Sequence, residues 1–184
     1  MYYIPARQTN QRIKMNRDYA LETEKNDYLL LEHFNKVLKL MELGKCPEKH
    51  TTDASGYTTD GRIANIELKS RDLHFSGMTL IGATSNNMPY TADTLYLEAH
   101  KAGDMLLDYV VDKKIPLYIN FMKNGYVILF NLSTLKHRPK KVCKKIYSKL
   151  YQGFELAKRE ELQLKDAWIY QMINNEYKLI HKPE

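Results

Sequence analysis

The chain of 184 residues is 43% hydrophobic and 27% charged, a composition typical of an ordinary globular protein and a length that suits one domain. No apolar run approaches the ~20 residues of a membrane helix. Cys46 and Cys143 lack metal-ligand spacing, so we expect reduced thiols and a cytoplasmic protein without a membrane partner. The 28 Lys and Arg against 22 Asp and Glu give a net charge of +6, which fits a polyanionic partner.

The predicted elements alternate between helices and strand pairs. Helices are predicted where apolar residues recur at a spacing of about 3.6, and strands where they alternate between turn signals. In chain order, the predicted elements are a helix over 18–42, strands over 50–58 and 62–69, a helix over 91–112, strands over 115–122 and 126–132, a basic helix over 139–163, and strands over 168–173 and 177–181.

This order predicts an α+β fold, an α/β sandwich whose mixed β-sheet is flanked by helices, followed by a basic C-terminal helix and a hairpin. No repeat or linker divides the chain, so one domain is expected over 1–184, with a core over about 18–132 and a basic extension over 133–184. Residues before the first helix are expected to form a polar arm. Thr91 or Asp93 is expected to cap the second helix, which should be buried through Leu95, Ala99, Leu106 and Val110.

The strand over 62–69 presents two charged residues on one side. Side chains alternate between the faces of a sheet, so Glu67 and Lys69 share one face, roughly 7 Å apart. The apolar residues Ala64, Ile66 and Leu68 share the other face and anchor the strand in the core. The strand therefore presents a carboxylate and an ammonium group from a rigid element, as a functional site requires.

Two aspartates precede this strand, and geometry separates them. Asp60 belongs to the Asp60-Gly61 turn, roughly 20 Å along the hairpin from Glu67, too far to share a metal ion with it. A three-residue loop with Gly61 in the left-handed conformation places Asp53 directly opposite Glu67, with side chains about 5 Å apart. A two-residue loop would place Asp53 opposite Leu68 on the wrong face. The prediction of Asp53 as the partner of Glu67 therefore depends on the hairpin register.

Asp53, Glu67 and Lys69, in the pattern Asp-x13-Glu-x-Lys, resemble the PD-(D/E)xK nuclease superfamily, which includes restriction endonucleases, phage exonucleases and archaeal Holliday-junction resolvases. The elements over about 18–132 match that family's core, although Thr52 stands where the family has a proline. The stretch IELKSR is similar to small bacterial and phage members, in which a helix with a lysine follows, here Lys101. The resemblance implies a restriction endonuclease-like fold and a nuclease of a bacterial or phage-infected cytoplasm.

The resemblance also implies a role for each residue of the pattern. Asp53 and Glu67, with the Leu68 carbonyl, would bind Mg²⁺ or Mn²⁺, which prefer hard oxygen ligands. Lys69 would orient the attacking water and offset negative charge, and Lys101 would contact the scissile phosphate. Hydrolysis of a DNA phosphodiester bond is the expected reaction, and homodimers are common among relatives that cut both strands.

Some members of the family add an acid from the first helix. Glu24 and Asp27 both qualify, since Asp27 lies near the middle of the apolar face of the predicted helix and Glu24 at its edge. Asp27 could equally be an edge residue paired with a backbone donor. Glu24 is favoured because its longer side chain reaches further from the helix.

A basic run follows the predicted core. It contains no acid between Leu135 and Gly153, and it is either a phosphate-binding element or the solvated face of a helix whose Val142, Ile146 and Leu150 pack inward. The predicted DNA contacts are Arg71, Lys140, Lys141, Lys144 and Lys145.

The leading hypothesis from the sequence is a Mg²⁺- or Mn²⁺-dependent DNA endonuclease. The alternatives are a catalytically silent nucleic-acid-binding protein of the same fold and a phage regulatory protein that acts on a host enzyme. Salt-sensitive DNA binding without cleavage would favour the first alternative, and absence of DNA binding the second.

Overall fold

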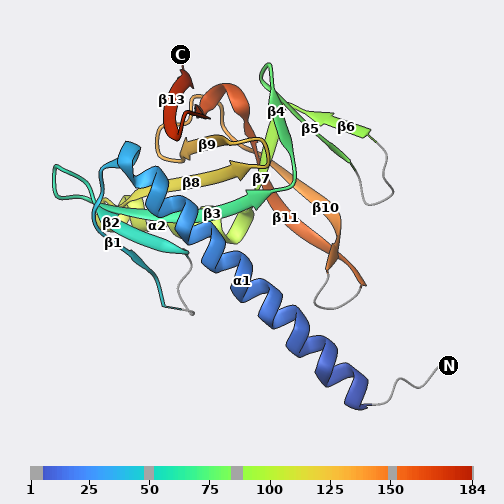
Figure 1. Cartoon of the computed structure of the whole chain (residues 1–184). Coiled ribbons are helices and arrows are strands. Elements are labelled where there is room, and N and C mark those ends of the chain that lie inside the picture. The colour runs from blue at the N-terminus through green and yellow to red at the C-terminus, as the bar shows by residue number, and fades with distance from the viewer. Residues whose placement is uncertain (1–5, 48–51, 84–88, 149–152, 184) are drawn as a thin grey trace.

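A mixed β-sheet forms the centre of the molecule (Figure 1). The computed structural model describes residues 6–47, 52–83, 89–148 and 153–183, and within these ranges seven strands form this sheet in the order β1-β2-β3-β8-β9-β12-β13. Strands β3 and β8 are parallel and the other neighbours are antiparallel. The strands are β1 (Met41–Lys45), β2 (Ala54–Tyr57), β3 (Ile63–Arg71), β8 (Ile115–Met122), β9 (Tyr126–Asn131), β12 (Trp168–Ile173) and β13 (Glu176–His181).

Two helices, α1 (Ala6–Leu38) and α2 (Ala99–Asp112), cover opposite faces of this sheet. In Figure 1, α1 crosses in front of the sheet and α2 lies behind it. Leu31 and Phe34 of α1 are fully buried in one core cluster, and Met105 of α2 is buried in the other. The predicted α+β sandwich with a mixed sheet is therefore confirmed. Neither helix, over its described residues, is long and apolar enough to span a membrane.

Two smaller three-stranded sheets complete the described part of the molecule. The first has the order β10-β11-β7, and it packs with α2 on the same side of the central sheet, where Leu97 of β7 and Leu162 of β11 join the core cluster of Met105. The second has the order β4-β5-β6. The remaining elements are β4 (His74–Ser76), β5 (Thr79–Ala83), β6 (Pro89–Ala92), β7 (Thr94–Glu98), β10 (Lys140–Ser148), β11 (Gly153–Gln163) and the 3-10 helix η1 (Leu164–Asp166).

The predicted basic helix over 139–163 is wrong. The chain forms the antiparallel strand pair β10–β11 there. Strand β7 adds a third strand to this pair, with Thr94–Glu98 antiparallel to Arg159–Gln163. The sequence pattern is ambiguous because Val142, Ile146 and Leu150 are four residues apart, a spacing that shares one face in a helix and also in a strand. The pairing with the distant strand β7 selects the strand.

The predicted second helix is correct at its C-terminal end and wrong at its start. Leu95 and Leu97, exposed by 3% and 1%, alternate inward along β7, and α2 begins at Ala99 after an N-cap at Glu98 without a side-chain hydrogen bond. The helix turns a different face to the core than expected. Leu106 and Val110, predicted to be buried, are 38% and 64% exposed.

Helix α1 differs from the prediction at both ends. The residues predicted as an arm are helical from Ala6 onward. The helix stops at Leu38 because Lys39 adopts a left-handed φ of 55° and the Asn35 side chain exchanges two hydrogen bonds of 2.9 Å with the backbone of Leu40. The predicted strand over 50–58 is shorter, and its first two residues lie outside those described.

We expect Gly61→Ala to destabilise the protein. Gly61 has φ +80°, and the cost of about 1–2 kcal/mol for a side chain in this region exceeds the gain from a less flexible unfolded chain. An added Cβ meets no atom within 4 Å, so the loss of about 1 kcal/mol is purely conformational. Urea denaturation measures it. Gly103→Ala, in helix α2 with equal space, is the matched control and should stabilise by about 1 kcal/mol. Equal effects of the two substitutions would contradict the turn conformation.

Candidate metal-dependent nuclease site

The β2–β3 hairpin has the predicted register. Ala54 pairs with Ile66 and Ser55 with Asn65, and the turn is closed by hydrogen bonds from Thr58 N to Arg62 O at 2.8 Å and from Gly61 N to Thr58 O at 2.9 Å. This confirms the predicted three-residue loop. At Asp53 the ladder departs from this register, because the Asp53 N–H donates to the carbonyl of Ile66, the residue that Ala54 already faces. Asp53 therefore lies beside the segment from Ile66 to Leu68, and the predicted direct pairing with Glu67 is not part of the ladder.

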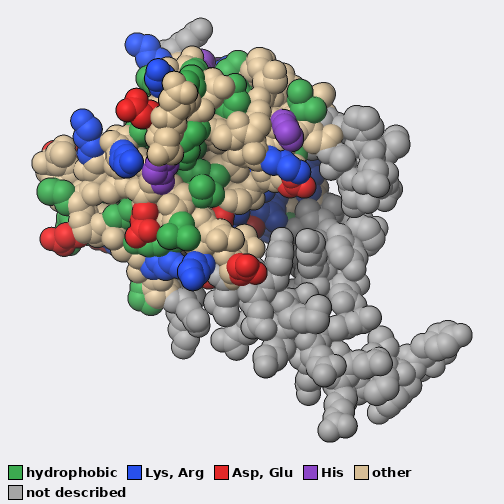
Figure 2. All heavy atoms as spheres, in the orientation of Figure 1, with side chains coloured by type: hydrophobic (Ala, Val, Ile, Leu, Met, Phe, Trp, Pro, Cys, Tyr) green, Lys and Arg blue, Asp and Glu red, His purple; other side chains and the backbone are tan. Residues whose placement is uncertain are grey.

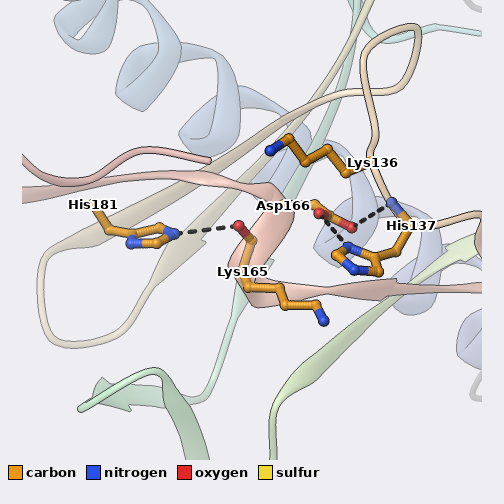
Figure 3. Close-up of a pocket in the computed structure, with 5 residues that line it drawn as sticks. All are labelled: Lys136, His137, Lys165, Asp166 and His181. Carbon is orange, nitrogen blue, oxygen red and sulfur yellow. Dashed lines mark hydrogen bonds and ion pairs between the residues drawn. The ribbon is translucent and has the colours of Figure 1, made fainter. Parts of the chain in front are cut away.

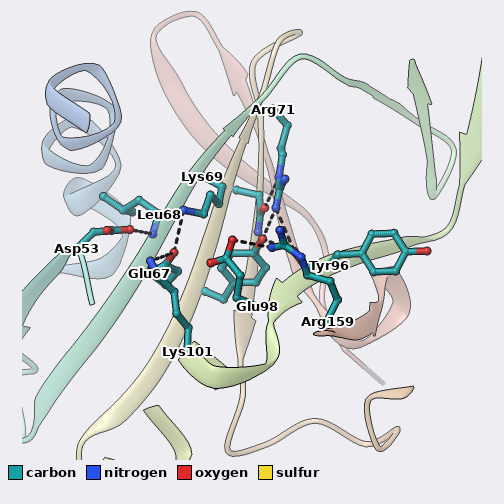
Figure 4. Close-up of polar contacts among 11 residues, drawn as sticks. Asp53, Glu67, Leu68, Lys69, Arg71, Tyr96, Glu98, Lys101 and Arg159 are labelled. Atoms are coloured by element: carbon teal, nitrogen blue, oxygen red, sulfur yellow. Dashed lines mark hydrogen bonds and ion pairs between the residues drawn. The ribbon is translucent and has the colours of Figure 1, made fainter. Parts of the chain in front are cut away.

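Two hydrogen bonds join Asp53 to the strand that carries Glu67 and Lys69. Its backbone N–H donates to the carbonyl of Ile66 at 2.9 Å, and its carboxylate accepts a hydrogen bond of 2.7 Å from the Leu68 N–H. The carboxylate thus takes the place of a backbone carbonyl where the β2–β3 ladder ends. The Asp53 charge therefore lies beside the residue between Glu67 and Lys69 (Figure 4).

Asp60 belongs to the turn, as predicted. Its carboxylate binds the Arg62 side chain at 2.7 and 2.8 Å and accepts a hydrogen bond from the Thr58 hydroxyl. The hydrogen bond from Arg62, with that from Thr58, lowers the pKa of Asp60 to about 2. Asp60 and Arg62 are each 54% exposed, so this pair stabilises the turn little.

Glu67 is a fully buried carboxylate held by two lysines. Lys101 Nζ contacts both carboxylate oxygens, at 2.6 and 2.7 Å, and Lys69 Nζ contacts Oε1 at 2.9 Å. Burial raises the pKa of Glu67, and the nearby charge of Asp53 acts in the same direction against the two lysines. Burial alone would lower the pKa of Lys69, but the charge of Glu67 and its hydrogen bond outweigh burial and raise that pKa. The four predicted side chains therefore form one electrostatically coupled group.

Glu98 and Arg159 extend this group, and the sequence did not indicate either residue. Arg159 Nη1 lies 2.6 Å from Glu98 Oε1, and the two residues are cross-strand partners in β7 and β11. Burial would raise the pKa of Glu98, but the charges of Lys69 and Arg159 lower it. Figure 4 shows Glu98 beside Lys69 and Lys101, at the start of α2. A third carboxylate thus lies next to the two lysines, held by the hairpin that carries the basic run.

Arg71 lies in an internal polar network rather than on an open surface. Its guanidinium group donates to Asn120 Oδ1 and the Tyr96 carbonyl, each at 3.1 Å, and to the Tyr118 hydroxyl. Tyr118 and Asn120 are fully buried. The side-chain nitrogen of Asn120 has no hydrogen-bond partner in the described part of the chain. DNA contact by Arg71 stays a prediction, while its structural role is visible.

We expect Arg71→Ala to lower the free energy of unfolding by about 2–4 kcal/mol, because it leaves buried acceptors without a charged donor. Chemical denaturation measures this loss. Lys141→Ala, at an exposed lysine of β10, serves as control and should change stability by less than about 0.5 kcal/mol. A stability loss no larger than that of the control would show that the network contributes little.

The two first-helix acids have different surroundings. Asp27 is 8% exposed and accepts a hydrogen bond from the Ser70 hydroxyl. Ser70 shares the face of β3 that carries Ile66 and packs against α1, opposite the face of Glu67. Glu24 is exposed, and no contact joins it to Asp53 or Glu67 among the described residues. A catalytic role of Glu24 stays a prediction.

The predicted DNA-binding lysines lie on strand β10. Lys140, Lys141 and Lys144 are exposed, and Lys144 Nζ lies 4.9 Å from the centre of the Tyr96 ring. The side chain of Lys145 lies outside those described. On the face drawn in Figure 2, Lys and Arg side chains of the described residues are interspersed with acidic ones rather than gathered in one patch. DNA contact by these lysines stays a prediction.

The oxygen atoms of the site suit Mg²⁺ or Mn²⁺. No group of three His, Cys, Asp or Glu side chains is placed to hold a metal ion within the described ranges. Mg²⁺, however, commonly binds one or two carboxylates and completes its coordination with water and substrate phosphate. Asp53 and Glu67 supply two such carboxylates from adjoining segments of a rigid hairpin. The ligand set fits, provided that Lys101 leaves the Glu67 oxygens.

Comparisons with known proteins identify no family for this chain. No protein-family model and no curated protein matches it. Among solved structures it is similar to Hjc of Archaeoglobus fulgidus, a Holliday junction resolvase from an archaeal hyperthermophile, with 11% sequence identity and a TM-score of 0.43 over 78% of this chain and 82% of that chain. This TM-score is too low to establish a shared fold, and the family stays a prediction from the residues.

Proposed function

We propose that the chain is a metal-dependent DNA nuclease. The observation that carries the proposal is the hydrogen bond from the Leu68 N–H to the Asp53 carboxylate, which fixes an acid beside Glu67 and Lys69 in one hairpin. Two acids and a lysine held on a rigid element are the groups that metal-assisted phosphodiester hydrolysis needs. The resemblance of the same three residues to the PD-(D/E)xK pattern supports this chemistry.

Each residue has a separate task in the proposed reaction. Asp53, Glu67 and the Leu68 carbonyl would hold the ion, which would supply positive charge at the phosphate and make a water molecule more acidic. Lys69, beside Glu67, orients that water for attack on phosphorus and offsets the negative charge that develops. Lys101 contacts the phosphate after leaving Glu67. The P–O bond to the leaving nucleotide breaks, and the products are a phosphate monoester and a hydroxyl end.

Cleavage assays on purified protein test the proposal. Supercoiled plasmid and a branched duplex are incubated with Mg²⁺ or Mn²⁺, with EDTA, and with Lys69→Ala in place of the wild type. The proposal predicts cleavage by the wild type that EDTA abolishes and that Lys69→Ala reduces by about 10²-fold or more. Cleavage that survives EDTA would contradict the requirement for a metal ion. Equal cleavage by Lys69→Ala and the wild type would contradict the assignment of the catalytic site.

A second candidate is a DNA-binding protein without catalytic activity. The observation that favours it is the pairing of both Glu67 oxygens with ammonium groups, which satisfies the carboxylate without a metal ion. This candidate predicts salt-sensitive DNA binding and no cleavage with any divalent cation.

A further inference from the structure

A small pocket lies away from Asp53 and Glu67, beyond strand β9 of the central sheet. It is formed by three separate segments: the loop after β9, the 3-10 helix η1 and the end of β13 (Figure 3). Four of its five lining side chains are basic or can take up a proton, and one is a carboxylate. The lining residues are Lys136, His137, Lys165, Asp166 and His181.

The single carboxylate is buried and already engaged. The Asp166 side chain is 3% exposed, and Oδ1 lies 2.8 Å from His137 Nδ1 while Oδ2 accepts the His137 backbone N–H at 3.3 Å. Leu164 and Ala167, on either side, belong to the buried core. Asp166 is therefore fixed by the core and orients the His137 ring. Nδ1 of the ring faces the carboxylate, and Nε2 is available to another hydrogen-bonding group.

The two lysines of the pocket stand apart from the ion pairs found in the described part of the chain. Neither Lys136 nor Lys165 forms an ion pair among the described residues, in contrast to Lys69, Lys101 and Lys114, which all do. His181 Nε2 lies 3.3 Å from the Lys165 carbonyl, which ties the end of β13 to η1. The pocket thus combines two ammonium groups, neither of them ion-paired among the described residues, with one buried carboxylate and the imidazole that it orients.

We infer that this pocket binds a phosphate group. Ammonium groups donate hydrogen bonds to anionic oxygens, and two lysines line this pocket. The buried Asp166 is engaged by His137 and does not compete for the ligand. Because the chain is proposed to act on DNA, the favoured source is a backbone phosphate. This choice of source rests on the proposed function, whereas the pocket's preference for phosphate does not.

The position of the pocket suits a contact away from the cleaved bond. Strands β12 and β13, which flank η1 and carry His181, are three and four places from β3 in the sheet order. At ~4.8 Å per strand this is about 14–19 Å. With a rise of about 3.4 Å per nucleotide, a phosphate roughly four to six nucleotides from the reacting one would reach the pocket.

The first test measures binding of a labelled duplex by fluorescence anisotropy in EDTA at several salt concentrations, so that cleavage plays no part. The variant pair Lys136→Ala with Lys165→Ala is compared with Lys36→Ala with Lys178→Ala, two exposed lysines on α1 and β13. The pocket pair should weaken binding about tenfold and reduce the slope of log Kd against log salt by about one, as loss of one neutralised phosphate requires. The control pair should leave the slope unchanged.

The second test titrates inorganic phosphate against the wild type and follows the His137 ring nitrogens by NMR. A shift of these signals that the pocket pair abolishes, together with the change in DNA slope, establishes a backbone phosphate as the ligand. The same shift without any effect on DNA binding assigns the pocket to a small phosphate compound. No shift and no change in slope overturn the inference. Failure of the wild type to cleave DNA would overturn the proposed function and leave these results standing.

Discussion

Asp53→Asn is expected to abolish metal-dependent DNA cleavage, with a loss of about 10²-fold or more in rate. The substitution keeps the shape of the side chain, and its oxygen can still accept the Leu68 N–H. It removes the negative charge that, together with Glu67, would hold the divalent cation. Initial rates of plasmid nicking in Mg²⁺ and Mn²⁺ measure the loss, and partial rescue by Mn²⁺ would be consistent with a weakened ligand.

The matched control for this substitution is Asp60→Asn in the same hairpin. Asp60 is 54% exposed and its partners are turn residues, so its substitution should leave the cleavage rate within about twofold of the wild type and change stability by less than about 0.5 kcal/mol. An equal loss of activity in both variants would mean that the hairpin acts as a whole. Loss in Asp60→Asn alone would contradict the assignment of the two aspartates.

Lys101→Met is expected to change metal binding and cleavage in opposite directions. The Lys101 ammonium contacts both oxygens of a fully buried carboxylate, so a divalent cation must displace it to reach Glu67. Removing it should strengthen Mn²⁺ binding about tenfold or more, which corresponds to about 1.4 kcal/mol. Cleavage should nevertheless fall, because the phosphate loses its ammonium contact. Calorimetric Mn²⁺ titration and nicking rates provide the two measurements.

Lys114→Met provides the control for Lys101→Met. Lys114 follows the same helix and pairs with Asp108 and Asp112, outside the site, so both Mn²⁺ affinity and cleavage should stay at wild-type values. Weaker Mn²⁺ binding by Lys101→Met would show that Lys101 supports the metal site instead of competing with the ion. Absence of Mn²⁺ binding in the wild type and in Lys101→Met alike would contradict the metal site itself.

The central part of the fold could be predicted because local signals determine it. Asp60-Gly61 and Lys123-Asn124-Gly125 mark turns whose glycines adopt a φ of +80°, and Asn174 and Asn175 also take positive φ. Each turn fixes the register of the strands on either side of it. Because Asp53, Glu67 and Lys69 lie within one hairpin, their approach depends on a single turn, and so it could be derived from the sequence.

The parts that could not be predicted depend on contacts between distant segments. The basic run has a spacing compatible with a helix or a strand, and its pairing with β7 decides between them. The three-stranded sheet β4-β5-β6 begins in the stretch between the predicted strand over 62–69 and the predicted helix over 91–112, where the sequence indicates no element, because these strands are too short to show a clear alternation. The ion pair between Glu98 and Arg159 follows from the same long-range pairing, so no local pattern could have indicated these residues.

The most direct test of the metal site is the anomalous diffraction of crystals soaked in Mn²⁺. The proposal predicts a peak between the carboxylates of Asp53 and Glu67, with the Lys101 ammonium displaced from Glu67. Asp53→Asn crystals soaked in the same way should show a weaker peak or none. A Mn²⁺ peak elsewhere, or Lys101 still bound to both Glu67 oxygens at saturating Mn²⁺, would contradict the proposed site.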